Sequence, residues 1–220
     1  RVPVIKSTQR SAQASMEWFE ELGQYVDQDP VQFAFNLMTR SRRITYGNLQ
    51  DRDPQFVELV EEWLLKSEIA RGRVPAGTKQ VPPMFLPYKV RDVILPNRVA
   101  VSAMDMYSCT DGVPGDFHLV HLGSKALGGA GLVMTEMVCV SPEGRITPGC
   151  GGLWNDQQEA AWKRIVDFGH TTQAKMGIQV GHSGRKGATK LMWDGIDQPL
   201  DDGGWPIIGP SPIPYLPNSQ

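Results

Sequence analysis

Beyond residue 84 the sequence alternates short apolar runs with amphipathic helical patterns, and this alternation limits the folds that are open to the chain. Three apolar runs have the length of buried strands, at residues 98–102, 131–138 and 175–180. Helical patterns fill the intervals, and the second follows Asn155, a helix cap with capping-box spacing to Gln158. Strands that alternate with helices form parallel sheets. The pattern therefore predicts an α/β fold around a parallel sheet whose strands are covered on both faces.

Polar side chains follow each predicted strand at its carboxyl end. In parallel sheets these ends lie at one edge, where barrels and open α/β sheets hold their active sites. We therefore expect one shared basin there. For the stretch after the third strand, a basic surface loop is the alternative interpretation. The polar residues that follow the three strands in turn are Asp105, Tyr107, Ser108 and Cys109; Glu136, Cys139, Glu143 and Arg145; and Gln179, His182, Arg185 and Lys186.

The first part of the chain has a different pattern. Residues 1–65 show three helical apolar stripes, and the pairs Asp29-Pro30 and Asp53-Pro54 have the chemistry of helix starts. A basic cluster at residues 40–43 could bind a phosphate, although such clusters are more often solvated faces. Residues 66–83 are rich in glycine, proline and charge, and they predict an exposed linker. The predicted organisation is therefore helical over 1–65, a linker over 66–83 and the α/β part over 84–220.

Composition and motifs exclude several classes of function. A formal net charge of -2 gives no basis for nucleic-acid binding. No apolar run has transmembrane length and no signal peptide opens the chain, so we expect a cytoplasmic protein without a membrane partner. The cysteines match no metal-ligand spacing and are expected to be free thiols. No Gly-x-Gly-x-x-Gly follows a strand, which argues against a dinucleotide on a Rossmann turn.

Two histidines on the first predicted helix raise the question of a metal site. His118 and His121 stand three residues apart and could in principle bind a metal together. No third ligand lies near them in the sequence, and their place on the helix turns them away from the strand ends. We therefore favour packing or capping histidines over a metal-dependent hydrolase, and we predict no metal site.

Three motifs lie at the predicted strand ends: SAMDMYS at 102–108, SPEGRI at 141–146 and GIQVGHSGRK at 177–186. They resemble the Old Yellow Enzyme family of FMN-dependent NAD(P)H oxidoreductases. The resemblance covers residues 84–220 in consistent order and spacing. It implies an eight-stranded TIM (β/α)8 barrel, of which this chain would contain the N-terminal part, with the first three strands and the hairpin that closes the barrel floor.

The resemblance also implies a set of FMN contacts. Gln179 matches the family glutamine that hydrogen-bonds the pyrimidine edge of the flavin, where one amide can both donate and accept. A cation near flavin N1 would stabilise the negative charge that reduction develops there. The other positions that the resemblance assigns to the flavin are Ala103, Met104 and the backbone of Met137, along the isoalloxazine, and Arg185, assisted by His182, near N1.

Two further positions bear on catalysis. Tyr107 matches a site-facing aromatic residue in part of the family, as a substrate contact or a proton donor. Asp105 stands where many relatives carry Cys or Thr, which donate a hydrogen bond near flavin N5. An ionised carboxylate cannot donate and would disfavour the anionic reduced flavin, whereas a protonated one could replace the donor. We therefore expect Asp105→Asn or Asp105→Cys to raise the FMN potential.

Residues 1–65 resemble the helical tail of a FAD-dependent aromatic monooxygenase, notably in STQRSAQ at 7–13 and TRSRRITY at 39–46. A monooxygenase tail followed by this barrel is the arrangement of the bifunctional aroyl-CoA enzymes of the anthraniloyl-CoA monooxygenase and salicylyl-CoA 5-hydroxylase type. The resemblance implies an internal segment, with most of the FAD module before Arg1 and the rest of the FMN barrel after Gln220. The segment alone is then expected to be inactive.

The function implied by both resemblances has two flavin steps. The FAD module would hydroxylate an aroyl-CoA (2-aminobenzoyl-CoA or salicylyl-CoA) with NADH and O2, and the barrel would reduce the product by hydride transfer from NAD(P)H through FMN. A stand-alone type of FMN ene reductase with an enone-type substrate, or a non-catalytic junction segment that docks two flavin modules, are the alternatives. For the full-length protein we expect a homo-oligomer.

Overall fold

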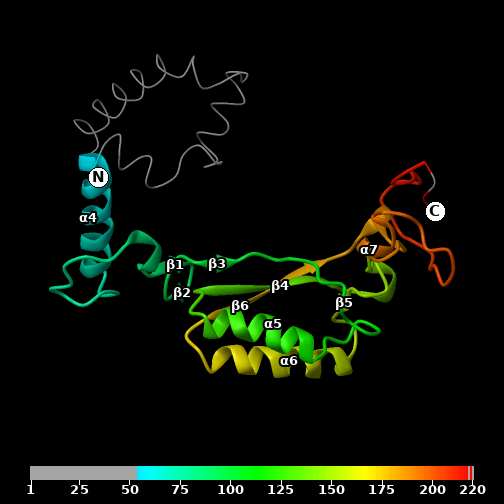
Figure 1. Ribbon diagram of the computed structural model, residues 1–220, viewed down its shortest axis with the longest axis horizontal. Helices are drawn as coiled ribbons and strands as arrows, with labels where there is room; N and C mark the ends of the chain where they lie inside the picture. Colours follow the sequence, from blue (N-terminus) through cyan, green and yellow to red (C-terminus); the bar gives the residue numbers. More distant parts are fainter. Residues whose placement is uncertain (1–53, 218, 220) are drawn as a thin grey trace, which may run out of the picture. The chain divides into compact units, whose positions relative to one another are not determined.

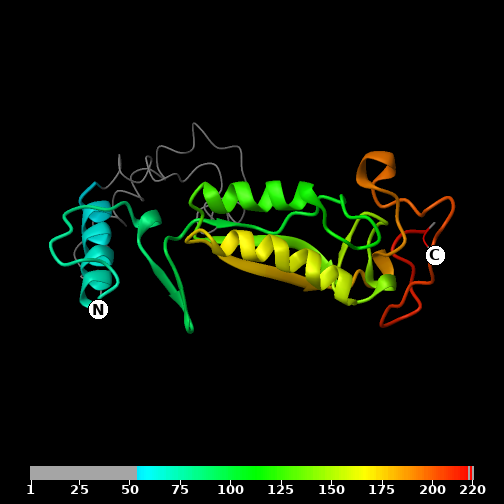
Figure 2. The ribbon, with the colours of Figure 1, turned by 90° about the horizontal axis from the view of Figure 1, so that it is seen from below.

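The computed structural model describes residues 54–217 and residue 219 (Figures 1 and 2). The chain divides into two compact units, Arg1–Leu86 and Pro87–Gln220. The helices and the basic cluster predicted within residues 1–53, and with them most of the monooxygenase-like tail, lie outside the described residues. None of the helices in the described range is both long and apolar enough to cross a lipid bilayer.

The described part of the first unit is organised around helix α4, Pro54–Ala70, which is followed by the short 3-10 helix η2, Pro83–Phe85. The apolar stripe predicted after Asp53-Pro54 forms α4, and Leu65 on it is buried. The helix continues to Ala70, so the prediction of a linker from residue 66 was wrong for its first residues. The charges there form a compact cluster, in which Glu68 is only 3% exposed and accepts hydrogen bonds from two arginines.

The second unit contains the predicted parallel sheet. Strand β4, Leu132–Cys139, pairs in parallel with β3, Ala100–Val101, with β5, Gly151–Gly152, and with β6, Lys175–Gly181. The predicted alternation of strands and helices is confirmed, because helix α5, Asp116–Leu127, connects β3 to β4 and helix α6, Asp156–His170, precedes β6. Before them lies a hairpin, as the resemblance implies, formed by β1, Tyr88–Val90, and β2, Val93–Leu95.

Helix starts in this unit follow the sequence signals closely but not in every case. Asn155 caps α6, and its Oδ1 accepts the backbone N–H of Gln158 at 2.9 Å, as predicted. At α5 the cap is Gly115, which has no side chain to accept a capping hydrogen bond. Asp116 is the first helical residue, and its carboxylate pairs with Arg164 Nη1 of α6 at 2.6 Å.

A β-bulge in β4 decides which side chains enter the core. Met134 is the register partner of Gly177 and Met137 that of Gln179, so β4 has one more residue than β6 across this interval. Residues that are five positions apart in a regular strand face opposite sides. Because of the extra residue, Val133 and Val138 both join the same buried cluster.

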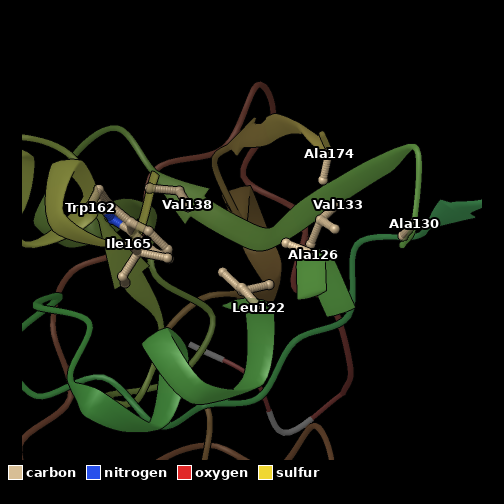
Figure 3. Packing of buried hydrophobic residues seen from close by; sticks show 8 residues of the cluster. All are labelled: Leu122, Ala126, Ala130, Val133, Val138, Trp162, Ile165 and Ala174. Carbon is tan, nitrogen blue, oxygen red and sulfur yellow. The ribbon is translucent and has the colours of Figure 1, made fainter. Parts of the chain in front are cut away.

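That cluster fills the space between the sheet and the two helices, which lie side by side on one face of it (Figures 1 and 2). Figure 3 shows Leu122 of α5 and the pair Trp162 and Ile165 of α6 directed toward the side chains of β4. The other members of the cluster are Ala126, Ala130, Val133, Val138 and Ala174. The core therefore lies on the helical face of the sheet.

Strand β6 is less covered than the sequence predicted. Ile178 is 41% and Val180 58% exposed, although both were expected in a strand buried on both faces. Within the described residues β6 pairs with β4 alone and lies at an edge of the sheet. Its apolar composition therefore does not translate into burial.

Among the described residues, the segment after residue 187 is largely irregular and contains the short helix α7, Met192–Gly195. It is fixed to the loop after β4, which carries the 3-10 helix η3, Pro142–Gly144. The Trp205 indole N–H donates to the carbonyl of Glu143 at 3.2 Å, and the Arg145 guanidinium lies 4.4 Å from the centre of the Trp205 ring.

Candidate active site

The loop that follows β3 and the carboxyl-terminal half of β4 meet at Asp105. One carboxylate oxygen of this half-buried residue accepts the backbone N–H of Met137 at 3.0 Å. Burial raises the pKa of the Asp105 carboxyl above its usual value, and the negative charge of Glu136 adds to the rise, while the Met137 N–H and Lys186 oppose it. The structure thus brings together two of the predicted site residues, which are far apart in the sequence.

Gln179 joins them from β6. It is the register partner of Met137 in the parallel pair, so the two residues lie side by side on neighbouring strands. Met176 of β6 packs against the core, and by strand alternation Gln179 lies on the face opposite to it. The Gln179 backbone N–H donates to Thr135 Oγ1 at 3.2 Å. Its side-chain amide is exposed and has no hydrogen-bond partner among the residues that the structure describes.

Tyr107 occupies the same loop in an uncommon backbone conformation. Its φ of 49° is left-handed, which is unfavourable for a residue with a bulky side chain. Its carbonyl lies so close to Gly149 that a Cβ there would stand 2.2 Å from the oxygen, so this position needs glycine. Burial, with a smaller contribution from the negative charge of Asp105, raises the pKa of Tyr107 to about 12. The phenol therefore keeps its proton at neutral pH.

The remaining predicted site residues are less tightly placed. Ala103 is half-buried and Met104 is exposed, both on the loop after β3. His182 directly follows β6, with its Nδ1 accepting the N–H of Gly184 at 3.0 Å. Arg185, in the 3-10 helix η4, Gly184–Lys186, lines a separate hollow of about 670 Å³ formed largely by residues 207–214. Asp105, Met137 and Gln179 thus form the centre of the site, and Arg185 faces another hollow.

Comparison with known proteins assigns the family of the chain. Residues 83–206, more than half of it, match the NADH:flavin oxidoreductase / NADH oxidase family. The chain belongs to this family.

Two relatives and one solved structure show the extent of the likeness. The NADH:flavin oxidoreductase FG08077 of Gibberella zeae is 41% identical over 145 residues, which are 63% of this chain and 35% of the relative. The NADPH dehydrogenase of Listeria monocytogenes is 50% identical over 105 residues, 47% of this chain and 31% of the relative. The old yellow enzyme from Trypanosoma cruzi aligns with a TM-score of 0.50 at 26% identity, over 60% of this chain and 36% of that one. The chain thus spans about a third of the length of these relatives.

Family membership supports the expected Old Yellow Enzyme-like fold. It does not test the expectation of a bifunctional aroyl-CoA monooxygenase and reductase. The parallel α/β arrangement is consistent with part of such a barrel. The family match begins at residue 83, so it does not bear on the monooxygenase-like residues 1–65.

A buried carboxylate, Glu136, lies beside this site in a place that its position in the sequence does not indicate. Glu136 was expected only as one of the polar residues after the second strand, yet it lies within β4, 3% exposed, and hydrogen-bonds the loop after β3. His118 has the predicted capping role, since its Nδ1 accepts the N–H of Gly115 at 3.3 Å. In the structure His118 also lies next to Glu136 and Cys109, two residues that can bind metals, although the sequence indicated no third ligand near it. One signal was present in the sequence, because a glutamate inside an apolar strand needs buried partners.

Proposed function

We propose that the protein is an FMN-dependent NAD(P)H oxidoreductase that reduces an electron-poor double bond in a small molecule of the enone type. The observation that carries this proposal is the meeting of Asp105, Met137 and Gln179 at the ends of the strands, with the Gln179 amide exposed and unpaired among the described residues. Family membership supports it, with FMN and NAD(P)H as the cofactors.

The residues present fit a flavin. A flavin ring needs an apolar surface and one edge of alternating donors and acceptors; Met137 offers the first and the Gln179 amide the second. Met104, in contrast, lines a small hollow with His118 and Leu122 of α5. When bound, FMN would supply the hydride-carrying chemistry. Ala103, at the loop after β3, would line the same surface, and His182 would stand at its edge. Arg185 would have to turn from its present hollow to reach the N1 end.

Asp105 occupies the backbone N–H of Met137, which would otherwise be available to the flavin. The Met137 N–H, expected to reach a flavin carbonyl, already donates to Asp105 Oδ1. Its raised pKa shifts the carboxyl toward the protonated form, and when protonated it would accept from Met137 with one oxygen and donate an O–H from the other. In that form Asp105 would replace the hydroxyl or thiol donor that the family resemblance assigns to this position.

Tyr107 is the candidate proton donor to the reduced substrate. With a pKa raised to about 12, the phenol remains protonated over the whole physiological range. Proton donation by a positioned side chain contributes on the order of 10²- to 10⁴-fold to rate. Tyr107→Phe in the intact protein should lower enone reduction by a factor in this range while flavin reduction by NAD(P)H continues.

The experiment that tests the function compares two glutamines in the intact protein. Gln179→Leu removes the amide from the site, whereas Gln173→Leu makes the same change at an exposed position just before β6. We expect Gln179→Leu to lose FMN and NAD(P)H-dependent reduction of an α,β-unsaturated ketone, and Gln173→Leu to retain both. Equal behaviour of the two variants would contradict the proposed site.

A second candidate is the bifunctional aroyl-CoA monooxygenase and reductase. It rests on the resemblance of residues 7–13 and 39–46 to a monooxygenase tail, both outside the described residues. Flavin analysis of the intact protein separates the two. FAD together with FMN would support the bifunctional enzyme, and FMN alone would support the ene reductase.

A further inference from the structure

Glu136 connects three elements beside the proposed flavin site. Its Oε2 accepts the backbone N–H of Met106 at 3.0 Å and that of Tyr107 at 3.3 Å. Its Oε1 lies 2.7 Å from Nε2 of His118 on α5. The carboxylate therefore links strand β4 and helix α5 to the loop that carries Asp105 and Tyr107.

The partners of His118 indicate which ring nitrogen carries the proton. The backbone N–H of Gly115 donates to Nδ1, so Nδ1 is unprotonated. The proton is then on Nε2, which donates it to Glu136. His118 is accordingly neutral in this arrangement. All three of these donors to Glu136 are uncharged groups.

Cys109 completes a buried trio of metal-ligand types with these two residues. Its Sγ lies 3.4 Å from His118 Nε2 and 3.9 Å from Glu136 Oε1. A histidine that binds a metal through Nε2 usually donates a proton from Nδ1, whereas here Nδ1 accepts one. Burial and the charge of Glu136 also raise the pKa of the Cys109 thiol, which disfavours the thiolate that a metal needs. The donor set therefore fits a hydrogen-bonded network better than a metal centre.

We propose that Glu136, oriented by His118, is a positioning residue that fixes the loop bearing Asp105 and Tyr107 against the end of β4. The catalytic importance of this loop rests on the proposed flavin function, whereas the structural role of Glu136 does not. The left-handed φ of Tyr107 is unfavourable and persists only when neighbouring contacts impose it. The bonds from the Met106 and Tyr107 amides to Glu136 supply such contacts at the strained residue and at the residue before it.

Glu136 lies in the interval of β4 that contains the bulge. Glu136 immediately precedes Met137, where the register with β6 resumes. Its side chain is directed to α5, while the backbone of Met137 bonds Asp105. Two adjacent residues of β4 thus hold two points of the same loop, one by a side chain and one by the main chain.

The test measures hydrogen–deuterium exchange of the Met106 and Tyr107 amides in the intact protein. Glu136→Gln keeps the size of the side chain but loses one acceptor oxygen and the charge. We expect exchange of these amides to accelerate on the order of tenfold or more, the factor for loss of a hydrogen bond to a charged group. Glu68→Gln, which changes an equally buried carboxylate in the other unit, is the matched control and should leave both amides unchanged.

His118 provides a second pair of variants in case Glu136→Gln does not fold. His118→Gln retains an N–H donor toward Glu136, whereas His118→Leu retains none. We expect faster exchange of the Met106 and Tyr107 amides in His118→Leu and restored protection in His118→Gln. Equal exchange in both variants would overturn the role of His118.

One readout separates positioning from general stabilisation. The alkaline difference spectrum of Tyr107, assigned by subtraction of Tyr107→Phe, should titrate at a lower pH in Glu136→Gln than in the unchanged protein, because a nearby negative charge is lost. An unchanged titration together with unchanged exchange would overturn the proposal.

Zinc retained in stoichiometric amount and lost in Cys109→Ala would also overturn it, in favour of a metal site. Intact protein without flavin would contradict the proposed function, while exchange still decides the role of Glu136.

Discussion

The two units each bury a glutamate, and the partners of the two carboxylates differ. Glu68 in the first unit and Glu136 in the second are both 3% exposed. Glu68 accepts from Arg71 Nη1 at 2.9 Å and from Arg73 Nε at 2.6 Å, so two cations offset its charge. Glu136 accepts from two backbone amides and from a histidine whose other ring nitrogen is itself an acceptor.

The difference shows in the groups around each carboxylate. The hydrogen bond from Arg73 is the largest cause of the lowered pKa of Glu68, and burial of Glu68 opposes it. The pKa of Asp105 is raised mainly by the burial of Asp105 itself, and the negative charge of Glu136 adds to the rise. A buried carboxylate paired with cations stabilises its own unit. One held by neutral donors also acts on its neighbours, and here those neighbours are the candidate catalytic groups.

The largest expected effect is on stability. Glu136→Ala leaves the His118 Nε2–H and two backbone amides buried without an acceptor, so we expect the second unit to lose about 3–5 kcal/mol. Glu68→Ala frees two guanidiniums, and that of Arg71 is already half exposed, so we expect a loss of about 1–2 kcal/mol in the first unit. Urea unfolding monitored by hydrogen–deuterium exchange of amides in each unit measures the two losses of stability. Equal losses would remove the distinction.

The next effect is on the redox potential of the flavin-loaded protein. Asp105→Asn removes a carboxyl whose ionised form disfavours a reduced, negatively charged flavin. We expect the FMN potential to rise by about 30 mV or more, which corresponds to a tenfold change for two electrons. The rise should be larger at pH values above the raised pKa of Asp105 than below it, because only the ionised form carries the charge. A potential that does not change at either pH would remove Asp105 from the mechanism.

The smallest expected effect is on the pH dependence of stability, and it has opposite signs in the two units. The pKa of Glu68 is lowered, so its contribution is present above the usual glutamate value and is lost as the pH falls through its folded value. The pKa of Asp105 is raised, so its contribution is complete below the usual aspartate value and is lost as the pH rises through its folded value.

Exchange measured in each unit between pH 3 and pH 7 tests these signs. On acidification the contribution of Glu68 should fall and that of Asp105 should rise, each taken as the difference between the unchanged protein and the variant at that residue. Glu68→Gln should remove the first dependence and Asp105→Asn the second. The same sign in both units would contradict the assignment of partners.

The sequence was sufficient to predict the sheet and the approach of the strand ends. The apolar runs at 131–138 and 175–180 became neighbouring parallel strands, and Asn155 capped its helix. Met137 and Gln179 lie on neighbouring strands, as successive long strands of such folds do. The roles of these residues toward FMN remain proposals.

The sequence did not reveal the features that depend on register and long-range pairing. The bulge that lets Val133 and Val138 share one core is invisible in a pattern of alternating residues. Glu136 and His118 are separated by a helix and a turn, so their spacing gives no sign of a 2.7 Å contact. Likewise, glycine and charge after residue 66 predicted a linker, whereas the pairing of Glu68 with two arginines stabilises the end of α4.

The most direct test of the proposed flavin site is hydrogen–deuterium exchange of the intact protein with and without FMN. We expect added FMN to protect three separate segments together, residues 102–108, 134–138 and 177–182, and to leave 54–70 unchanged. Protection confined to one of the three segments, or found only elsewhere, would contradict a flavin bound where these strands end.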